Sequence, residues 1–241
     1  SNSASREIAG TLAYDLGSGF YIEAAADAKT ANDYQDGSGR NERSSYTQRH
    51  QSLTFGYAAD GVELALDIEQ DRAEDVIFAG AGMDSPLSEG RTYRLRGGFD
   101  VDLGALKRVE TTLYQSNVDH VMDNYTLRPV SGMLMRVPST SDTMGGKIEG
   151  QFEFGRTTAK VGIDLQSSAR PAIAYGGMAG MRAKIDASDP TVSRFLMWPD
   201  VTIAQTGIYG ETDTALSDRT TLTLGLRYDH VRASAGAAAG L

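Results

Sequence analysis

The sequence predicts an all-β protein: an antiparallel transmembrane β-barrel section of about ten strands, with short periplasmic turns and long extracellular loops. Three observations predict this fold class. Apolar and polar residues alternate along many segments, the connections between these segments alternate in length, and charged residues share one face of the clearest segments. No run approaches the roughly 18 apolar residues of a membrane helix, whereas a membrane strand needs only about 9–11 residues.

The clearest strand covers residues 62–69, where every second residue is apolar: Val62, Leu64, Leu66 and Ile68. A helix would scatter these side chains around its axis, whereas a strand places them on one face. The same alternation, strong in some segments and weaker in others, predicts ten strands in chain order: 8–15, 20–27, 49–57, 62–69, 92–101, 106–117, 145–154, 158–165, 203–213 and 222–229.

The connections alternate strictly between short and long. The short ones fall near 16–19, 59–61, 102–105, 155–157 and 214–219, and the long ones near 29–47, 72–91, 119–143 and 169–202. This pattern is typical of outer-membrane barrels, in which tight periplasmic turns alternate with long outer loops. A β-sandwich with one solvated face would also alternate apolar and polar residues, but it would rarely place all its long loops at one end.

Charged side chains indicate which face of the sheet meets water. Glu149, Gln151 and Glu153 alternate with apolar neighbours on one strand. A charge that faces lipid near the bilayer midplane costs about 2–4 kcal/mol. We therefore expect these side chains to face a wet or plugged lumen.

The phase of the strands predicts that both chain ends lie at the long-loop side. A complete bacterial barrel has an even number of strands and both termini in the periplasm. Ten strands with both chain ends at the long-loop side are therefore expected to be an internal section of a larger barrel, unless the alternation has failed to reveal two strands. A cut sheet would leave two unpaired edges, which lipid does not tolerate.

Composition narrows the chemistry. The chain has 23 Lys and Arg against 32 Asp and Glu, a net charge of −9, which disfavours a nucleic-acid partner. It has no Cys, which removes thiolate metal sites and cysteine catalysis from this chain. We find no Ser-His-Asp order, phosphate-binding loop or HExxH motif, and expect no catalytic residues, no catalytic cofactor and no enzyme activity.

A His-x-Met pair, His120 and Met122, stands at a strand end before the third long loop. Side chains two residues apart in a strand point the same way, so an imidazole nitrogen and a thioether sulfur would converge. A thioether strongly prefers soft Cu(I). Three further methionines, Met83, Met133 and Met135, are poorer candidates for transient metal capture. Because Met more often fills gaps between apolar side chains, a packing role stays open for all four methionines.

Other polar and aromatic residues carry weaker expectations. Aromatic girdles at the membrane interfaces are expected to include Trp198, Tyr14, Tyr57 and Tyr228. The acids in or near the predicted long loops are expected to be solvated and to attract cations by their field alone. These acids are Asp33, Asp36, Asp84, Asp119 and Asp123.

Two runs carry a family resemblance: Asp119-His120-Val121-Met122-Asp123-Asn124-Tyr125-Thr126-Leu127-Arg128, and Ser141-Asp142-Thr143-Met144-Gly145-Gly146-Lys147. They resemble the barrel of TonB-dependent outer-membrane copper receptors. Weaker stretches that agree occur in the family's order and cover most of the chain. They are Ser1-Asn2-Ser3, Asn32-Asp33-Tyr34-Gln35-Asp36-Gly37 and Ala79-Gly80-Ala81-Gly82-Met83-Asp84.

The resemblance implies a 22-stranded barrel with an N-terminal plug, energised through TonB in the bacterial outer membrane. Residues 1–241 would then be a partial barrel, with the plug domain and the remaining strands absent. His120 and Met122 match the barrel half of the family's copper site. The other half, a Cys-x-x-x-Met pair of the plug, has no counterpart here. The implied partners are a copper ion as transported ligand, outer-membrane lipid, and TonB through the missing plug.

Three other functions stay open. A sibling receptor for a siderophore or cobalamin would carry the same barrel signals, and a passive porin would conduct without a plug. Ten-stranded outer-membrane proteases carry Asp–His pairs at the rim, which Asp119-His120 imitates, but the strand phase argues against a complete ten-stranded barrel.

Overall fold

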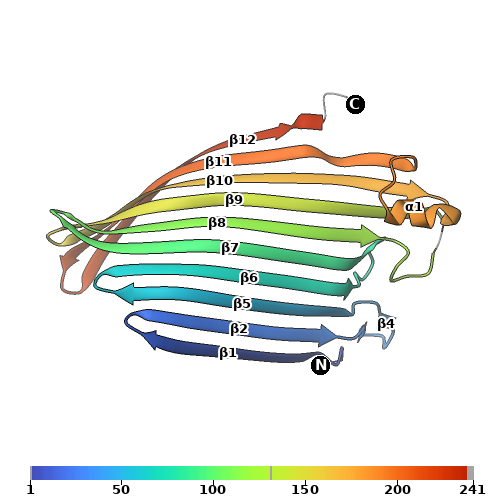
Figure 1. Cartoon of the computed structure of the whole chain (residues 1–241), viewed down its shortest axis with the longest axis horizontal. Coiled ribbons are helices and arrows are strands. Elements are labelled where there is room, and N and C mark those ends of the chain that lie inside the picture. The colour runs from blue at the N-terminus through green and yellow to red at the C-terminus, as the bar shows by residue number, and fades with distance from the viewer. Residues whose placement is uncertain (1, 131, 238–241) are drawn as a thin grey trace.

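The computed structural model describes residues 2–130 and 132–237. Their main element is one ten-stranded antiparallel sheet whose strands pair in chain order, from β1 at one edge to β12 at the other (Figure 1). Its strands are β1 (Arg6–Gly17), β2 (Phe20–Ala31), β5 (Tyr46–Ala59), β6 (Val62–Val76), β7 (Asp84–Leu103), β8 (Leu106–Asp123), β9 (Leu134–Phe154), β10 (Thr157–Gly177), β11 (Ser193–Ser217) and β12 (Thr220–Ala235).

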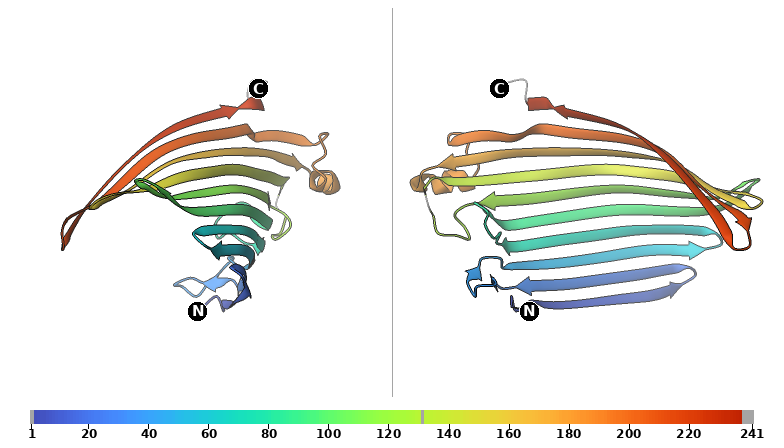
Figure 2. Two further views of the ribbon diagram at one scale, coloured as in Figure 1. Left: turned by 60° about the vertical axis from the view of Figure 1, so that its left-hand side comes forward. Right: turned by 180° about the vertical axis from the view of Figure 1, so that it is seen from behind.

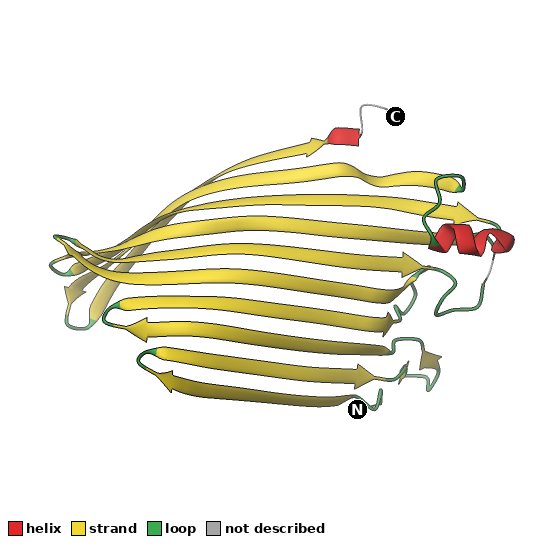
Figure 3. Ribbon diagram, in the orientation of Figure 1, coloured by secondary structure: helices red, strands yellow, loops and turns green. Residues whose placement is uncertain are grey.

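The ten expected strands and the alternation of their connections are confirmed. The turns from β1 to β2, β5 to β6, β7 to β8, β9 to β10 and β11 to β12 are short and lie at one end of the sheet (Figure 3). In the turn between β5 and β6, Asp60 and Gly61 both have positive φ, 52° and 74°. Asp-Gly is favoured where both central residues of a two-residue hairpin turn need positive φ.

The long connections lie at the opposite end, together with the start of β1 and the end of β12 (Figure 1). They span residues 32–45, 77–83, 124–133 and 178–192. The first carries the small hairpin of β3 (Tyr34–Gln35) and β4 (Asn41–Glu42), and the last carries the 3-10 turn η1 (Ala179–Met181) and the short helix α1 (Arg182–Asp186). Sequence periodicity did not predict these small elements.

The strands extend further toward the long-loop end than the alternation predicted. β7 begins at Asp84 rather than at 92, and β9 begins at Leu134 rather than at 145. Both faces of these extensions carry polar residues, so a pattern that depends on one apolar face cannot detect them. Met135, expected in a loop, therefore lies within β9.

The two faces of the sheet differ in chemistry. Pairing places Leu66, Leu95 and Leu113 side by side on one face, where all three are exposed. We call this the apolar face. The opposite, polar face carries ion pairs between strands. Arg96 Nε of β7 lies 2.7 Å from Asp67 Oδ2 of the neighbouring β6, and Arg108 Nη2 of β8 reaches across β7 to Glu63 Oε2 of β6 at 2.8 Å.

The sheet is twisted and curved, but it does not close on itself: β1 and β12 are its two edges (Figure 2). Among the described residues, no helix has both the length and the apolar character needed to cross a membrane.

Candidate functional site

The His-x-Met pair lies near the loop end of β8, on the polar face. His120 pairs with Ser88 of β7 and with Ser139 of β9, and Met122 pairs with Val137 of β9. Both side chains are partly buried. Because extended backbone sends alternate side chains to the same face, the imidazole and the thioether are presented together, as the spacing predicts.

An open pocket of about 540 Å³ surrounds this pair. Its lining comes from five consecutive strands of the sheet, β7 to β11. The lining includes Ser88, Val118, His120, Met122, Val137, Ser139, Thr140, Ser141, Arg170, Pro171, Ala172, Met197 and Trp198. The pocket thus gathers one imidazole, two thioethers, one indole and one guanidinium.

Trp198 occupies a place that the sequence did not predict. It pairs with Ala172, which pairs with Ser139, which pairs with His120, so these four residues form one row across β11, β10, β9 and β8. Trp198 therefore belongs to this pocket, and our expectation that it joins an aromatic girdle is wrong. Met197, its neighbour, is a soft donor that sequence reasoning missed, because no local pattern links β11 to β8.

The state of His120 suits metal binding at neutral pH. The residue lies beyond Leu113 toward the loops, where the apolar face has given way to polar residues such as the exposed Asp119. Burial lowers the pKa of His120 below its ordinary value. A neutral imidazole keeps a nitrogen lone pair free for a metal.

The donor set favours a soft metal ion. Imidazole suits copper and several other transition metals, whereas thioether sulfur selects Cu(I). Hard ions take carboxylate oxygens, and over residues 2–130 and 132–237 no three His, Cys, Asp or Glu side chains group as a metal site.

The other candidate methionines lie outside this pocket. Met135 is on β9, two residues before Val137 and on the same face. Since Val137 pairs with Met122, Met135 lies one side-chain row nearer the long loops than Met122. Met133 comes just before β9, near Gly176 of β10. Met83 lies in the loop before β7 and is partly buried.

Two of the acids expected to be solvated are buried structural residues. The Asp84 side chain has no exposed surface and accepts hydrogen bonds from Arg128 Nε at 2.9 Å, from Arg43 Nη2 at 3.1 Å and from the backbone N–H of Phe78 at 3.1 Å. It thereby joins three of the long loops. Asp123 is also buried, and accepts from the backbone N–H groups of residues 125 and 126.

Helix α1 is fixed to the third long loop through Tyr125. The Tyr125 hydroxyl donates to Asp186 Oδ1 at 2.6 Å, and Arg182 stacks on the Tyr125 ring at 5.0 Å. Below the helix, the side chains of a small apolar cluster pack together: Tyr125, Leu134, Tyr175, Ile185 and Val192.

We expect Tyr125→Phe to loosen α1 while the sheet stays intact. The substitution removes one hydrogen bond to a carboxylate, worth about 1.5–3 kcal/mol, and keeps the ring that packs below the helix. Faster trypsin cleavage after Arg182 and Lys184 in the complete receptor would report the loosening. Tyr46→Phe, at the start of β5, is the matched control. Equal cleavage of all three proteins would show that the hydroxyl does not anchor α1.

Fold and comparisons together define the class of protein. The sequence model of the family "TonB dependent receptor-like, beta-barrel" matches residues 11–240, so the chain belongs to this family of bacterial outer-membrane transporters and receptors. Such proteins are not enzymes. No curated protein matches the chain in the sequence search.

Solved structures share the fold at low identity. The copper transporter OprC matches with a TM-score of 0.76 and 24% identity over 95% of this chain and 38% of its own. The FrpB iron transporter from Neisseria meningitidis matches with a TM-score of 0.63 and 15% identity over 95% of this chain and 39% of its own. BauA, the ferric preacinetobactin receptor from Acinetobacter baumannii, matches with a TM-score of 0.60 and 13% identity over 95% of this chain and 40% of its own. This chain thus spans about 38% of the length of OprC.

Proposed function

We propose that this chain is part of a receptor that takes copper across the outer membrane. The observation that carries the proposal is the soft donor set of one pocket: His120 and Met122 on adjacent same-face positions of β8, with Met197 across the pocket on β11. Supporting it, the solved structure with a TM-score of 0.76 is named a copper transporter.

The long loops then face the cell exterior and the short turns face the periplasm. Copper arriving from outside would meet Met133, then Met135, and then the pocket of His120 and Met122, because these side chains follow one another down the polar face. Met83 would contribute to capture from the neighbouring loop. Weak thioether contacts suit transient capture, since transport needs release as well as binding.

In this proposal residues 1–241 are one section of a larger barrel. The edges of β1 and β12 carry unpaired backbone groups that lipid would not tolerate, so further strands would pair there. A plug domain elsewhere in the complete polypeptide would supply the remaining copper ligands and receive the pull of TonB.

A metal chelate is the alternative cargo. The pocket also presents Arg170 and Trp198, which would suit an anionic, flat ligand. Two of the similar structures are named an iron transporter and a ferric preacinetobactin receptor.

Uptake by cells that depend on the complete receptor tests the proposal. We expect accumulation of ⁶⁴Cu to require both the receptor and TonB, and to fall to the receptor-free background when His120→Ala and Met122→Leu are combined. His50→Ala is the control, since His50 lies on the same face but pairs with Asp71, outside the pocket. Receptor-dependent uptake of a ferric siderophore or cobalamin, with no copper accumulation, would replace copper as the cargo.

A further inference from the structure

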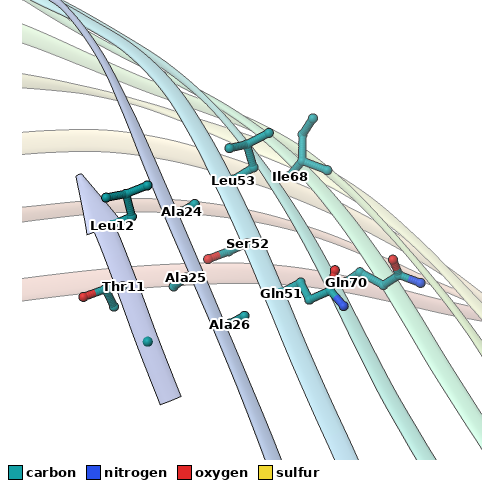
Figure 4. A pocket seen from close by; sticks show the side chains of 11 residues that line it. Thr11, Leu12, Ala24, Ala25, Ala26, Gln51, Ser52, Leu53, Ile68 and Gln70 are labelled. Carbon is teal, nitrogen blue, oxygen red and sulfur yellow. The ribbon is translucent and has the colours of Figure 1, made fainter. Parts of the chain in front are cut away.

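A shallow groove runs along the apolar face over β1, β2, β5 and β6 (Figure 4). Its volume is about 540 Å³. The floor is made of small residues, Gly10, Ala24 and Ala26, between Leu12 on one side and Leu53 with Ile68 on the other. The register explains the recess, because Gly10 pairs with Ala26 and Leu12 with Ala24.

The groove continues toward the long-loop end. A second hollow of about 410 Å³ shares Gly10, Ala26 and Gln51 with the first and adds Ile8, Ala28 and Arg49. A channel with an apolar floor therefore leads along the lipid-facing surface to a guanidinium group.

Arg49 is one end of a chain of ion pairs that crosses β5, β6 and β7. Arg49 Nη1 lies 3.2 Å from Glu74 Oε2, Arg72 Nη2 lies 3.0 Å from Glu74 Oε1, and Arg91 Nη2 lies 2.9 Å from Glu89 Oε1. Arg72 also contacts Glu89, at 3.5 Å. We call these five residues the arginine ladder.

The ladder presents positive charge outward. The side chains of Arg49, Arg72 and Arg91 are 55%, 40% and 60% exposed, whereas those of Glu74 and Glu89 are only 29% and 19% exposed. The guanidinium groups thus project beyond the carboxylates. Leu53, Ile68 and Tyr93 form the last apolar row before the ladder. Arg91 lies one row nearer the long loops, and Arg49 and Arg72 lie two rows nearer, at the loop-side edge of the apolar face.

This basic patch is local. In the same two rows of the apolar face, β8 carries Asn117 and Asp119, β9 carries Asp142 and Thr140, and β10 carries Ala169. In a chain whose net charge is −9, the three arginines of the ladder stand apart from these acidic and neutral residues, and one of them, Arg49, lines the loop-side end of the groove.

We propose that the groove and the arginine ladder together bind a phosphorylated, multiply acylated lipid of the outer leaflet. An acyl chain occupies the Ala-floored groove, and phosphate oxygens accept hydrogen bonds from Arg49 and Arg91. Guanidinium groups match phosphate geometry and form charge-assisted bonds with it. The height of the ladder fits a headgroup, because it begins where the apolar rows end.

Titration of the purified complete receptor with diphosphoryl lipid A, followed by native mass spectrometry, tests this site. We expect the double variant Arg49→Gln, Arg91→Gln to weaken binding at least about tenfold, equivalent to about 1.4 kcal/mol. The pair is chosen so that Glu74 and Glu89 both keep Arg72 as a partner. Arg94→Gln, on the polar face of β7, is the matched control and should bind like the unchanged receptor.

Two further arms separate the groove from the charges. Ala24→Phe fills the first hollow at a position that does not line the second hollow beside Arg49, and it should weaken binding several-fold. Lipid A without its phosphates should bind the unchanged receptor at least about tenfold more weakly. Equal binding by the double variant, equal binding of the dephosphorylated lipid, or full displacement of the lipid by an equal concentration of inorganic phosphate would each overturn the proposal.

Discussion

Replacing His120 with Ala should lower the affinity of the complete receptor for Ag⁺, a redox-inert substitute for Cu(I), by at least about 100-fold. Groups that merely orient a metal ligand already contribute about 10–100-fold to affinity, and a direct ligand contributes no less. Met122→Leu keeps the size and apolar character of the side chain and removes only the sulfur. We expect it to have a comparable effect, measured by competition titration with a chromogenic chelator.

The neighbouring strand offers a matched control. Met144 of β9 is exposed on the apolar face, away from the pocket, so Met144→Leu removes a thioether without changing the donor set. Unchanged Ag⁺ affinity in both His120→Ala and Met122→Leu would contradict the proposed site. A selective loss of affinity in Met197→Leu would add a second sulfur ligand to the site.

The pH dependence of this binding follows from the burial of His120. Burial lowers its pKa below the ordinary value of about 6.5, so at any given pH less of the imidazole is protonated than in a free histidine. We therefore expect Ag⁺ affinity to hold from pH 8 to pH 6.5 and to fall only at lower pH, as the imidazole binds a proton instead of the metal.

Replacing Asp84 with Asn should release three of the long loops at once. The change leaves Arg128 and Arg43 without their shared carboxylate, and removing one partner of a buried ion pair costs about 3–5 kcal/mol. We expect a cost near the lower end, since Arg43 is partly exposed. Trypsin should then cleave the receptor, on intact cells or after purification, after Arg43 at least about tenfold faster.

Asp119→Asn is the control for the loss of one negative charge, because Asp119 is exposed on the neighbouring β8. Equal cleavage rates in the Asp84 and Asp119 variants would show that the loops are held by other contacts. Hydrogen exchange of residues 32–45, 77–83 and 124–130 provides a second measurement, and it should accelerate in all three segments together.

Acid should act on the same contact. Burial by itself raises the pKa of Asp84, but the bonds from Arg128, Phe78 and Arg43 outweigh burial and hold the pKa below its ordinary value of about 3.9. A lowered folded-state pKa means that the contact contributes fully above the ordinary value and is lost as pH falls through the lowered one. Loop protection should therefore be constant from pH 8 to pH 5 and decline only below about pH 3.9.

Sequence reasoning succeeded where local periodicity carries the information. The alternation of Val62, Leu64, Leu66 and Ile68 is visible without knowing any partner strand, and the shared face of His120 and Met122 follows from their spacing alone. The short turns could also be predicted from adjacent residues alone, such as Asp60 and Gly61.

The features that sequence reasoning missed depend on contacts between segments that are distant in the chain. Met197 and Trp198 reach the pocket through the pairing of β11 with β10 and of β10 with β9, and no spacing in the chain encodes that row. Asp84 was expected in solvent, because its two arginine partners lie in other loops. Met135 was assigned to a loop, because polar residues on both faces hide the start of β9.

The ion pairs on the polar face have a consequence for how this sheet is assembled. A strand that pairs one residue out of place exchanges its two faces. For β7 such a slip would turn Arg94 and Arg96 toward lipid, which costs about 2–4 kcal/mol for each charge near the midplane. It would also leave Asp67 without its partner Arg96. The bilayer therefore acts against misaligned intermediates during insertion, and an error in one strand is penalised by the membrane itself before the next strand is added.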